Sequence, residues 1–265
     1  MCLRASRSPT KTSVVGEATE LSATLLRTES EAYSTRWSGV MFTHTFNNGH
    51  PAGTLEQQRA RMVEEQLRSR GIRDPRVLEA MSKVPREEFI ASNDLRDAYG
   101  DHPLPIGAGQ TVSQPYIVAA MVEALELQPR DRVLEVGTGT GYEAAILGEL
   151  AAEVWTIERH EELVDKARQI LARLGYSNVH VVHGDGSLGL PEHTPFDKIL
   201  VAAAAPRIPD SLVAQLAVGG RLVVPVGNRT DQQLHILRKL GSGIVVTTHD
   251  LCRFVPLIGE EGWES

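Results

Sequence analysis

The chain has 265 residues, of which 42% are apolar and 23% are charged, and its formal net charge is −7. This composition is ordinary for a soluble globular protein, and the acidic balance without a basic stripe argues against nucleic acid as a partner. No apolar run approaches the ~20 residues that span a bilayer, so no membrane partner is expected. Two distant cysteines, Cys2 and Cys252, argue against a disulfide framework and favour a cytoplasmic location.

Residues 1–53 differ in composition from the rest of the chain. Serine, threonine, arginine, glycine and asparagine dominate there, and apolar residues are sparse. Such a segment buries too little apolar surface to fold, so we predict a disordered extension. The alternative is an over-long translated start, with Met41 or Met62 closer to the true beginning.

Helices are predicted in the next part of the chain. Apolar residues at helical spacing predict one helix that ends near Gly71 and a second that runs from Asp74-Pro75 to Pro85. Tyr99 to Gln110 is rich in proline and glycine, and we expect an ordered but irregular loop there rather than a helix or strand. A third helix begins at Ser113-Gln114-Pro115.

Beyond Asp131 the chain alternates between strand and helix patterns, which predicts parallel strands joined by crossover helices. The expected strands are 132–136, 153–157, 179–183, 196–201 and 220–226, with helices at 142–150, 161–174 and 210–217. Two further runs, 234–240 and 244–254, flank Gly241-Ser242-Gly243 and predict an antiparallel hairpin at one sheet edge. The predicted fold class is α/β, with a doubly wound, mostly parallel, Rossmann-like sheet and N-terminal helices.

The strand 132–136 runs directly into Gly137, Gly139 and Gly141. Glycines at these positions allow a tight turn and a close approach to a ligand, because no Cβ intervenes. The next predicted strand delivers Glu158 close to the position, ~20 residues on, at which such sheets place a carboxylate against a ribose. The order of these features predicts a nucleotide-type cofactor. The spacing Gly-x-Gly-x-Gly, with Tyr142 next, disfavours NAD.

Glu135 before the glycines and His183-Gly184-Asp185-Gly186 after the third strand complete a pattern that resembles the class I S-adenosylmethionine-dependent methyltransferases. The resemblance implies that the glycine turn lies under the methionine and ribose portions, that Glu158 accepts from the ribose hydroxyls, and that Asp185 accepts from the adenine amino group. The implied cofactor-binding residues are Glu135, Gly137, Thr138, Gly139, Gly141, Glu158, Arg159, Asp185 and Gly186. Taken singly, Glu158 also fits a solvated strand end and Asp185 an Asp-Gly turn.

The segment 104–119, Leu-Pro-Ile-Gly-Ala-Gly-Gln-Thr-Val-Ser-Gln-Pro-Tyr-Ile-Val-Ala, resembles the signature of the protein-L-isoaspartate O-methyltransferases. The resemblance extends over residues 60–259 and includes the segments 84–89, 203–209, 219–227 and 253–257. One departure is the run of four alanines at 202–205, where many relatives carry threonine and an extra proline.

The resemblance implies methyl transfer from S-adenosylmethionine to the free carboxylate of L-isoaspartyl residues in damaged proteins and peptides, which starts their repair through a succinimide. It divides the expected single methyltransferase domain, 54–265, into a substrate-side helical region at 54–128, a cofactor-binding core at 129–230 and C-terminal strands at 231–265. Two alternatives stay open. One is a class I methyltransferase of another carboxylate or a small molecule, and the other is a non-catalytic isoaspartyl- or cofactor-binding module.

Ser113 is the candidate catalytic residue on the acceptor side. Its hydroxyl can position the acceptor carboxylate, and the competing interpretation is an N-cap of the helix that follows. Thr111, Val255, Pro256 and Leu257 are the candidate substrate-binding residues. The histidines show no metal-ligand spacing, so we expect no metal. Because protein acceptors need an open site, we expect a monomer.

Overall fold

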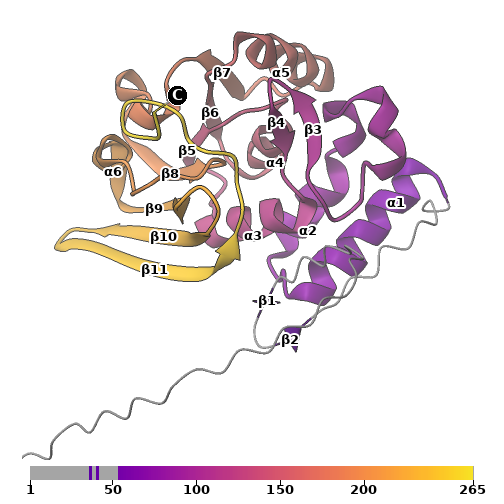
Figure 1. Ribbon diagram of the computed structural model, residues 1–265, viewed down its shortest axis with the longest axis horizontal. Helices are drawn as coiled ribbons and strands as arrows, with labels where there is room; N and C mark the ends of the chain where they lie inside the picture. The colour runs from indigo at the N-terminus through magenta and orange to yellow at the C-terminus, as the bar shows by residue number, and fades with distance from the viewer. Residues whose placement is uncertain (1–35, 38–39, 42–52, 265) are drawn as a thin grey trace, which may run out of the picture.

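The computed structural model describes residues 36–37, 40–41 and 53–264 (Figure 1). Arg36–Trp37 (β1) and Val40–Met41 (β2) pair antiparallel. The rest of the predicted extension, and with it the prediction of disorder over residues 1–53, lies outside the described residues. In the part of the chain that is described, no helix is both long and apolar enough to cross a membrane.

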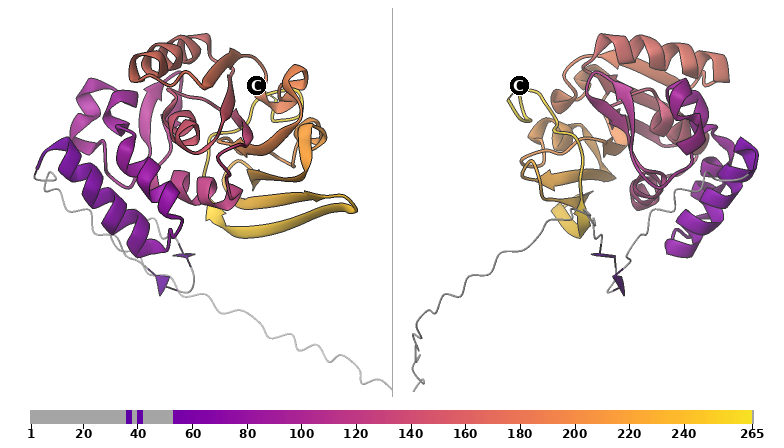
Figure 2. Two further views of the ribbon diagram at one scale, coloured as in Figure 1. Left: turned by 180° about the vertical axis from the view of Figure 1, so that it is seen from behind. Right: turned by 45° about the vertical axis from the view of Figure 1, so that its right-hand side comes forward.

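A seven-stranded sheet forms the centre of the fold, with strand order β11-β10-β9-β8-β5-β6-β7. Its strands are Arg132–Val136 (β5), Glu153–Glu158 (β6), Val179–His183 (β7), Phe196–Val201 (β8), Leu216–Gly227 (β9), Gln232–Leu240 (β10) and Gly243–Cys252 (β11). Strands β5 to β9 are parallel, and β10 and β11 add an antiparallel hairpin that projects from one edge (Figure 2). The predicted fold class is confirmed.

The larger apolar core lies between one sheet face and the helices Pro75–Lys83 (α2), Pro115–Leu125 (α3), Tyr142–Leu150 (α4) and Glu161–Leu174 (α5). The first predicted helix is continuous but changes character along its length. It runs as Leu55–Arg61 (α1), a π-helical Met62–Leu67 (η1) and a 3₁₀ turn Arg68–Arg70 (η2), and ends at Gly71 with φ of 101°. That left-handed conformation is one that glycine adopts without steric cost.

The smaller core covers the opposite sheet face. It contains Leu212 of the short helix Asp210–Gln215 (α6), Leu190 beside the 3₁₀ turns Gly186–Leu188 (η5) and Pro191–His193 (η6), and Leu257 of the C-terminal segment. Helix α6 is shorter than the predicted 210–217, because Leu216 already pairs with Phe196 as the first residue of β9.

The prediction of an irregular loop at 99–110 is wrong for its second half. Leu104–Gly107 (β3) and Gln110–Val112 (β4) form an antiparallel hairpin, turned by Ala108 and Gly109 with positive φ. Leu104, Ile106 and Val112 are buried on its inner side. Burial of these alternating residues against the core outweighs the intervening proline, whose side chain lies on the exposed side.

Candidate functional site

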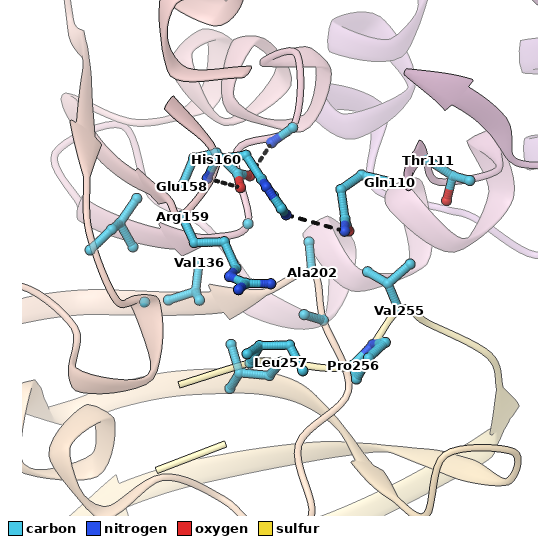
Figure 3. A pocket seen from close by; sticks show the side chains of 16 residues that line it. Gln110, Thr111, Val136, Glu158, Arg159, His160, Ala202, Val255, Pro256 and Leu257 are labelled. Atoms are coloured by element: carbon cyan, nitrogen blue, oxygen red, sulfur yellow. Dashed lines mark hydrogen bonds between the residues drawn. The ribbon is translucent and has the colours of Figure 1, made fainter. Parts of the chain in front are cut away.

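A cavity lies at the carboxyl edge of the sheet, where β5 and β8 are neighbours and the strand order changes direction. Sheets of this kind bind their ligands at that switch point. Its walls come from the ends of β5, β6 and β8, from β4 and from the segment after β11 (Figure 3). The lining residues are Gln110, Thr111, Val136, Gly137, Gly139, Ile157, Glu158, Arg159, His160, Gly186, Ala202, Ala203, Val255, Pro256, Leu257 and Ile258.

The glycine turn after β5 forms one wall. Gly137 and Gly139 line the cavity with φ of 97° and 54°, values that side chains other than glycine rarely adopt. Gly141 lies behind them and begins α4, where an added Cβ would contact Leu171 of α5 at 3.1 Å. Two of the three glycines therefore shape the cavity, and the third allows close packing between α4 and α5.

Glu158 stands at the end of β6, facing the glycine turn. Its Oε2 accepts a hydrogen bond from the Gly139 amide and its Oε1 accepts one from the His160 amide, both at 3.0 Å (Figure 3). The residue is only 6% exposed, so the interpretation of Glu158 as a solvated strand end is wrong. Each carboxylate oxygen has two lone pairs, which leaves acceptor capacity for hydroxyl groups of a ligand.

Glu135 and Thr138 do not line the cavity and lie beneath the turn instead. Thr156 of β6 donates a hydrogen bond to Oε2 of Glu135, and its own hydroxyl lies 2.6 Å from that of Thr138. Glu135 is fully buried, and burial, with Glu143 nearby, raises the pKa of its carboxyl well above the ordinary value. These residues support the turn from below.

Asp185 does not line the cavity in this structure. Its Oδ1 accepts from the Ser187 amide and hydroxyl at 2.9 and 2.7 Å, and its Oδ2 accepts from the Glu260 amide at 2.8 Å. The Asp-Gly turn interpretation therefore describes its local geometry, because Asp185 caps η5. Gly186, the next residue, does line the cavity. A contact between Asp185 and adenine stays a prediction.

On the acceptor side, Thr111 lines the cavity and Ser113 does not. Ser113 is half-buried between β4 and α3, and the N-cap position of α3 is Gln114, with no side-chain cap hydrogen bond. The N-cap interpretation of Ser113 is therefore wrong, because the helix begins one residue later than that interpretation requires. Ser113 carries a half-buried hydroxyl two residues from Thr111.

The C-terminal segment supplies the opposite wall. The Ala204 amide donates to the Val255 carbonyl and the Leu257 amide donates to the Ala204 carbonyl, both at 2.8 Å. This pairing extends the end of β8 by one more strand-like segment and presents Val255, Pro256 and Leu257 to the cavity (Figure 3).

Several lining residues were not predicted from the sequence. Gln110 and His160 lie 3.4 Å apart through their side-chain nitrogens, although 50 positions separate them in the chain. Ile258 lies one residue beyond the predicted wall, and Val136 and Ile157 are strand residues whose only signal is apolar character. Position directly after a parallel strand was the available signal for His160.

The residues present fit S-adenosylmethionine. Apolar side chains of Val136, Ile157 and Leu257 suit a planar base, the glycine turn lets a ligand approach its backbone closely, and Glu158 supplies a fixed carboxylate for hydroxyl groups. Among the described residues, no three histidine, cysteine, aspartate or glutamate side chains are grouped to hold a metal ion.

Comparison with known proteins identifies the family. Residues 57–262 match the family Protein-L-isoaspartate(D-aspartate) O-methyltransferase. A Koribacter versatilis protein-L-isoaspartate O-methyltransferase is 60% identical over 205 residues, which cover 77% of this chain and 92% of that protein. Protein-L-isoaspartate O-methyltransferase 2 of Pelobacter propionicus is 56% identical over 78% of this chain and 93% of its own length.

Solved structures agree. A protein-L-isoaspartate O-methyltransferase superimposes with a TM-score of 0.68 at 29% identity, covering 78% of this chain and 67% of that one. A Plasmodium falciparum chain described as a protein-L-isoaspartate O-methyltransferase, in complex with S-adenosyl-L-homocysteine, gives 0.65 at 27% identity and covers 76% of this chain and 98% of its own. The chain belongs to the protein-L-isoaspartate(D-aspartate) O-methyltransferase family, the S-adenosylmethionine-dependent enzymes that methylate isoaspartyl residues.

Proposed function

We propose that this chain transfers the methyl group of S-adenosylmethionine to the free carboxylate of L-isoaspartyl residues in damaged proteins and peptides, and that it does so in the cavity at the carboxyl edge of the sheet. The observation that carries the proposal is the position of Glu158. Two backbone amides hold its carboxylate at the cavity, between the glycine turn and the wall formed by Val255 to Leu257.

When bound, S-adenosylmethionine supplies a methyl group on a positively charged sulfonium, which a carboxylate oxygen can attack directly. An isoaspartyl carboxyl is ionised at neutral pH, so the enzyme needs no strong general base. Its residues have to align the acceptor oxygen with the methyl group and exclude water. The backbone of the glycine turn and Glu158 would hold the cofactor, while apolar Val255 and Leu257 would keep water from the reacting atoms.

On the acceptor side, Thr111 and Ser113 would position the isoaspartyl carboxylate. Thr111 is exposed at the cavity and can donate a hydrogen bond to an anion. Ser113 lies two residues after Thr111, in the connection between β4 and α3, and would add its hydroxyl to the acceptor side. Arg159, exposed at the rim, adds positive charge where an anionic peptide group would enter.

We also propose that the enzyme acts as a monomer in the cytoplasm, without a nucleic-acid or membrane partner. A protein substrate has to reach the cavity with its backbone attached, which an uncovered rim permits. Light scattering coupled to gel filtration tests the oligomeric state, and the mass of a dimer would reject the proposed monomer.

Matched peptides that differ only in an Asp or an isoAsp residue test the activity. With labelled S-adenosylmethionine, we expect a base-labile ester on the isoAsp peptide and none on the Asp peptide. Label on neither peptide but on another carboxylate would favour a different methyltransferase. Peptide binding without any turnover would favour a binding module, and either result would overturn the proposal.

A further inference from the structure

The chain folds back after β11, and its last described residues lie near α6 and the end of β8 (Figure 1). We call residues 259–264 the strap. Beginning at the end of β11, the C-terminal chain passes the end of β8 and reaches the region between β7 and α6. The strap thus joins parts of the fold that are distant in sequence.

The strap is tied directly to a residue of the cavity wall. The Trp263 amide donates to the Leu257 carbonyl at 2.7 Å, and the Trp263 indole donates to the Ala204 carbonyl at 3.1 Å. Ala204 also accepts from the Leu257 amide. The backbone of Leu257 is therefore held from one side by Ala204, which follows β8, and from the other by the strap.

The other end of the strap is anchored on polar groups outside the cavity. Both carboxylate oxygens of Glu261 accept from Ser211 of α6, from its amide at 3.0 Å and from its hydroxyl at 2.7 Å. The Glu261 amide donates to the Ser187 hydroxyl at 3.0 Å, and the Glu260 amide donates to Asp185.

The packing under the strap is tight. A Cβ built on Gly259 would lie 2.0 Å from Oδ1 of Asp185, and one built on Gly262 would lie 2.2 Å from the Leu257 carbonyl oxygen. The strap backbone can approach Asp185 and Leu257 this closely only because positions 259 and 262 are glycine. A loosened strap would therefore release Leu257 and Asp185 together.

We propose that Glu261 and Ser211 are positioning residues for the cofactor: they hold the strap closed, and the strap fixes the Val255 to Ile258 wall of the cavity. The proposal rests on the proposed function, because it assigns the cofactor to this cavity. Neither side chain lines the cavity. A wall ordered before binding costs less conformational entropy when the ligand arrives, so loosening the strap weakens binding without removing a contact.

The variants Ser211→Ala and Glu261→Gln each remove part of the anchor and leave every cavity-lining residue in place. We expect each to raise the Kd of S-adenosylhomocysteine about tenfold in calorimetry, mainly through faster dissociation. Ser82→Ala is the matched control, because its exposed hydroxyl donates to the Glu79 carbonyl of its own helix. It should bind like the wild type.

Amide hydrogen exchange of residues 259–264 reports how firmly the strap is held. If Glu261 and Ser211 served only the stability of the fold, faster exchange of the strap would not be accompanied by weaker binding. In the wild type, S-adenosylhomocysteine should slow exchange there, and both variants should exchange faster without ligand while thermal unfolding of the whole domain is kept. Unchanged Kd in both variants would overturn the proposal whether or not their strap exchange changes. Failure of the wild type itself to bind S-adenosylhomocysteine would instead reject the proposed function.

Discussion

The amide of Gly139 donates a hydrogen bond to Oε2 of Glu158 at 3.0 Å, which joins the glycine turn after β5 to the acid at the end of β6. The two halves of the cofactor motif thus form one unit before any ligand binds. A second amide, from His160, fixes the other oxygen. The carboxylate can therefore meet a ribose without first being ordered, so little rotamer entropy is lost on binding.

The first prediction concerns this carboxylate. Glu158→Gln is expected to raise the Kd of S-adenosylhomocysteine by about 10- to 100-fold, because the amide lacks the charge and replaces one acceptor oxygen with a donor that faces an N–H group. Calorimetry measures the change. Glu161→Gln, exposed in the first turn of α5, is the control. Wild-type affinity in E158Q would remove Glu158 from the cofactor site.

The cofactor half of the site was readable from the sequence because its parts are local. Gly137 and Gly139 lie just after β5 and Glu158 ends β6, and buried parallel strands are themselves near-continuous apolar runs. The predicted bounds of β5, β7 and β8 agree with the structure. Local sequence patterns were therefore enough to predict these strands and the glycine and glutamate positions, without knowledge of any tertiary contact.

Other features depend on contacts that no local pattern encodes. Gln110 meets His160 across 50 positions, and Asp185 meets Glu260 across 75. The β3–β4 hairpin forms because the core buries Leu104, although its proline and glycine content indicates a loop. For the hairpin, burial in the folded core outweighs the local propensity of its residues.

The second prediction separates a role of Ser113 in acceptor positioning from a structural one. Because Gln114 occupies the N-cap position, Ser113→Ala should leave thermal stability unchanged. We expect kcat/KM for an isoAsp peptide to fall about tenfold or more, with the Kd of S-adenosylhomocysteine kept. Ser242→Ala, exposed between β10 and β11, is the control. A lower melting temperature with full turnover would mean that the hydroxyl serves folding.

The third prediction is a pH dependence of stability. Burial raises the pKa of Glu143, at the start of α4, from 4.5 to about 8. Between these values the folded state keeps a proton that the unfolded chain has lost, so stability falls as pH rises from about 4.5 to about 8 and then levels off. Glu143→Gln is neutral throughout and should remove the part of this decline that Glu143 causes, while the buried Glu135, whose pKa is also raised, keeps its own part.

Urea unfolding near pH 5 and near pH 8 measures that effect. Relative to the wild type, E143Q should gain more stability at the higher pH than at the lower one. Glu192→Gln, which is exposed, provides the comparison for loss of a surface carboxylate. Equal gains at both pH values would show that Glu143 is ionised in the folded state across this range.

The fourth prediction concerns the floor of the cavity. A Cβ added to Gly186 would lie 2.4 Å from Cγ1 of Val136 and 3.3 Å from Cγ2 of Ile157, and both of these buried side chains line the cavity. Gly186→Ala should therefore destabilise the fold by about 1–3 kcal/mol and also weaken S-adenosylhomocysteine binding, because Val136 has to move into the space of the ligand. Gly241→Ala, with no atom within 4 Å of its added Cβ, is the control for urea unfolding and calorimetry. If G186A has the same free energy of unfolding and the same Kd of S-adenosylhomocysteine as G241A, the cavity floor has room for a methyl group. The prediction that Gly186 packs too closely for a side chain would then be wrong.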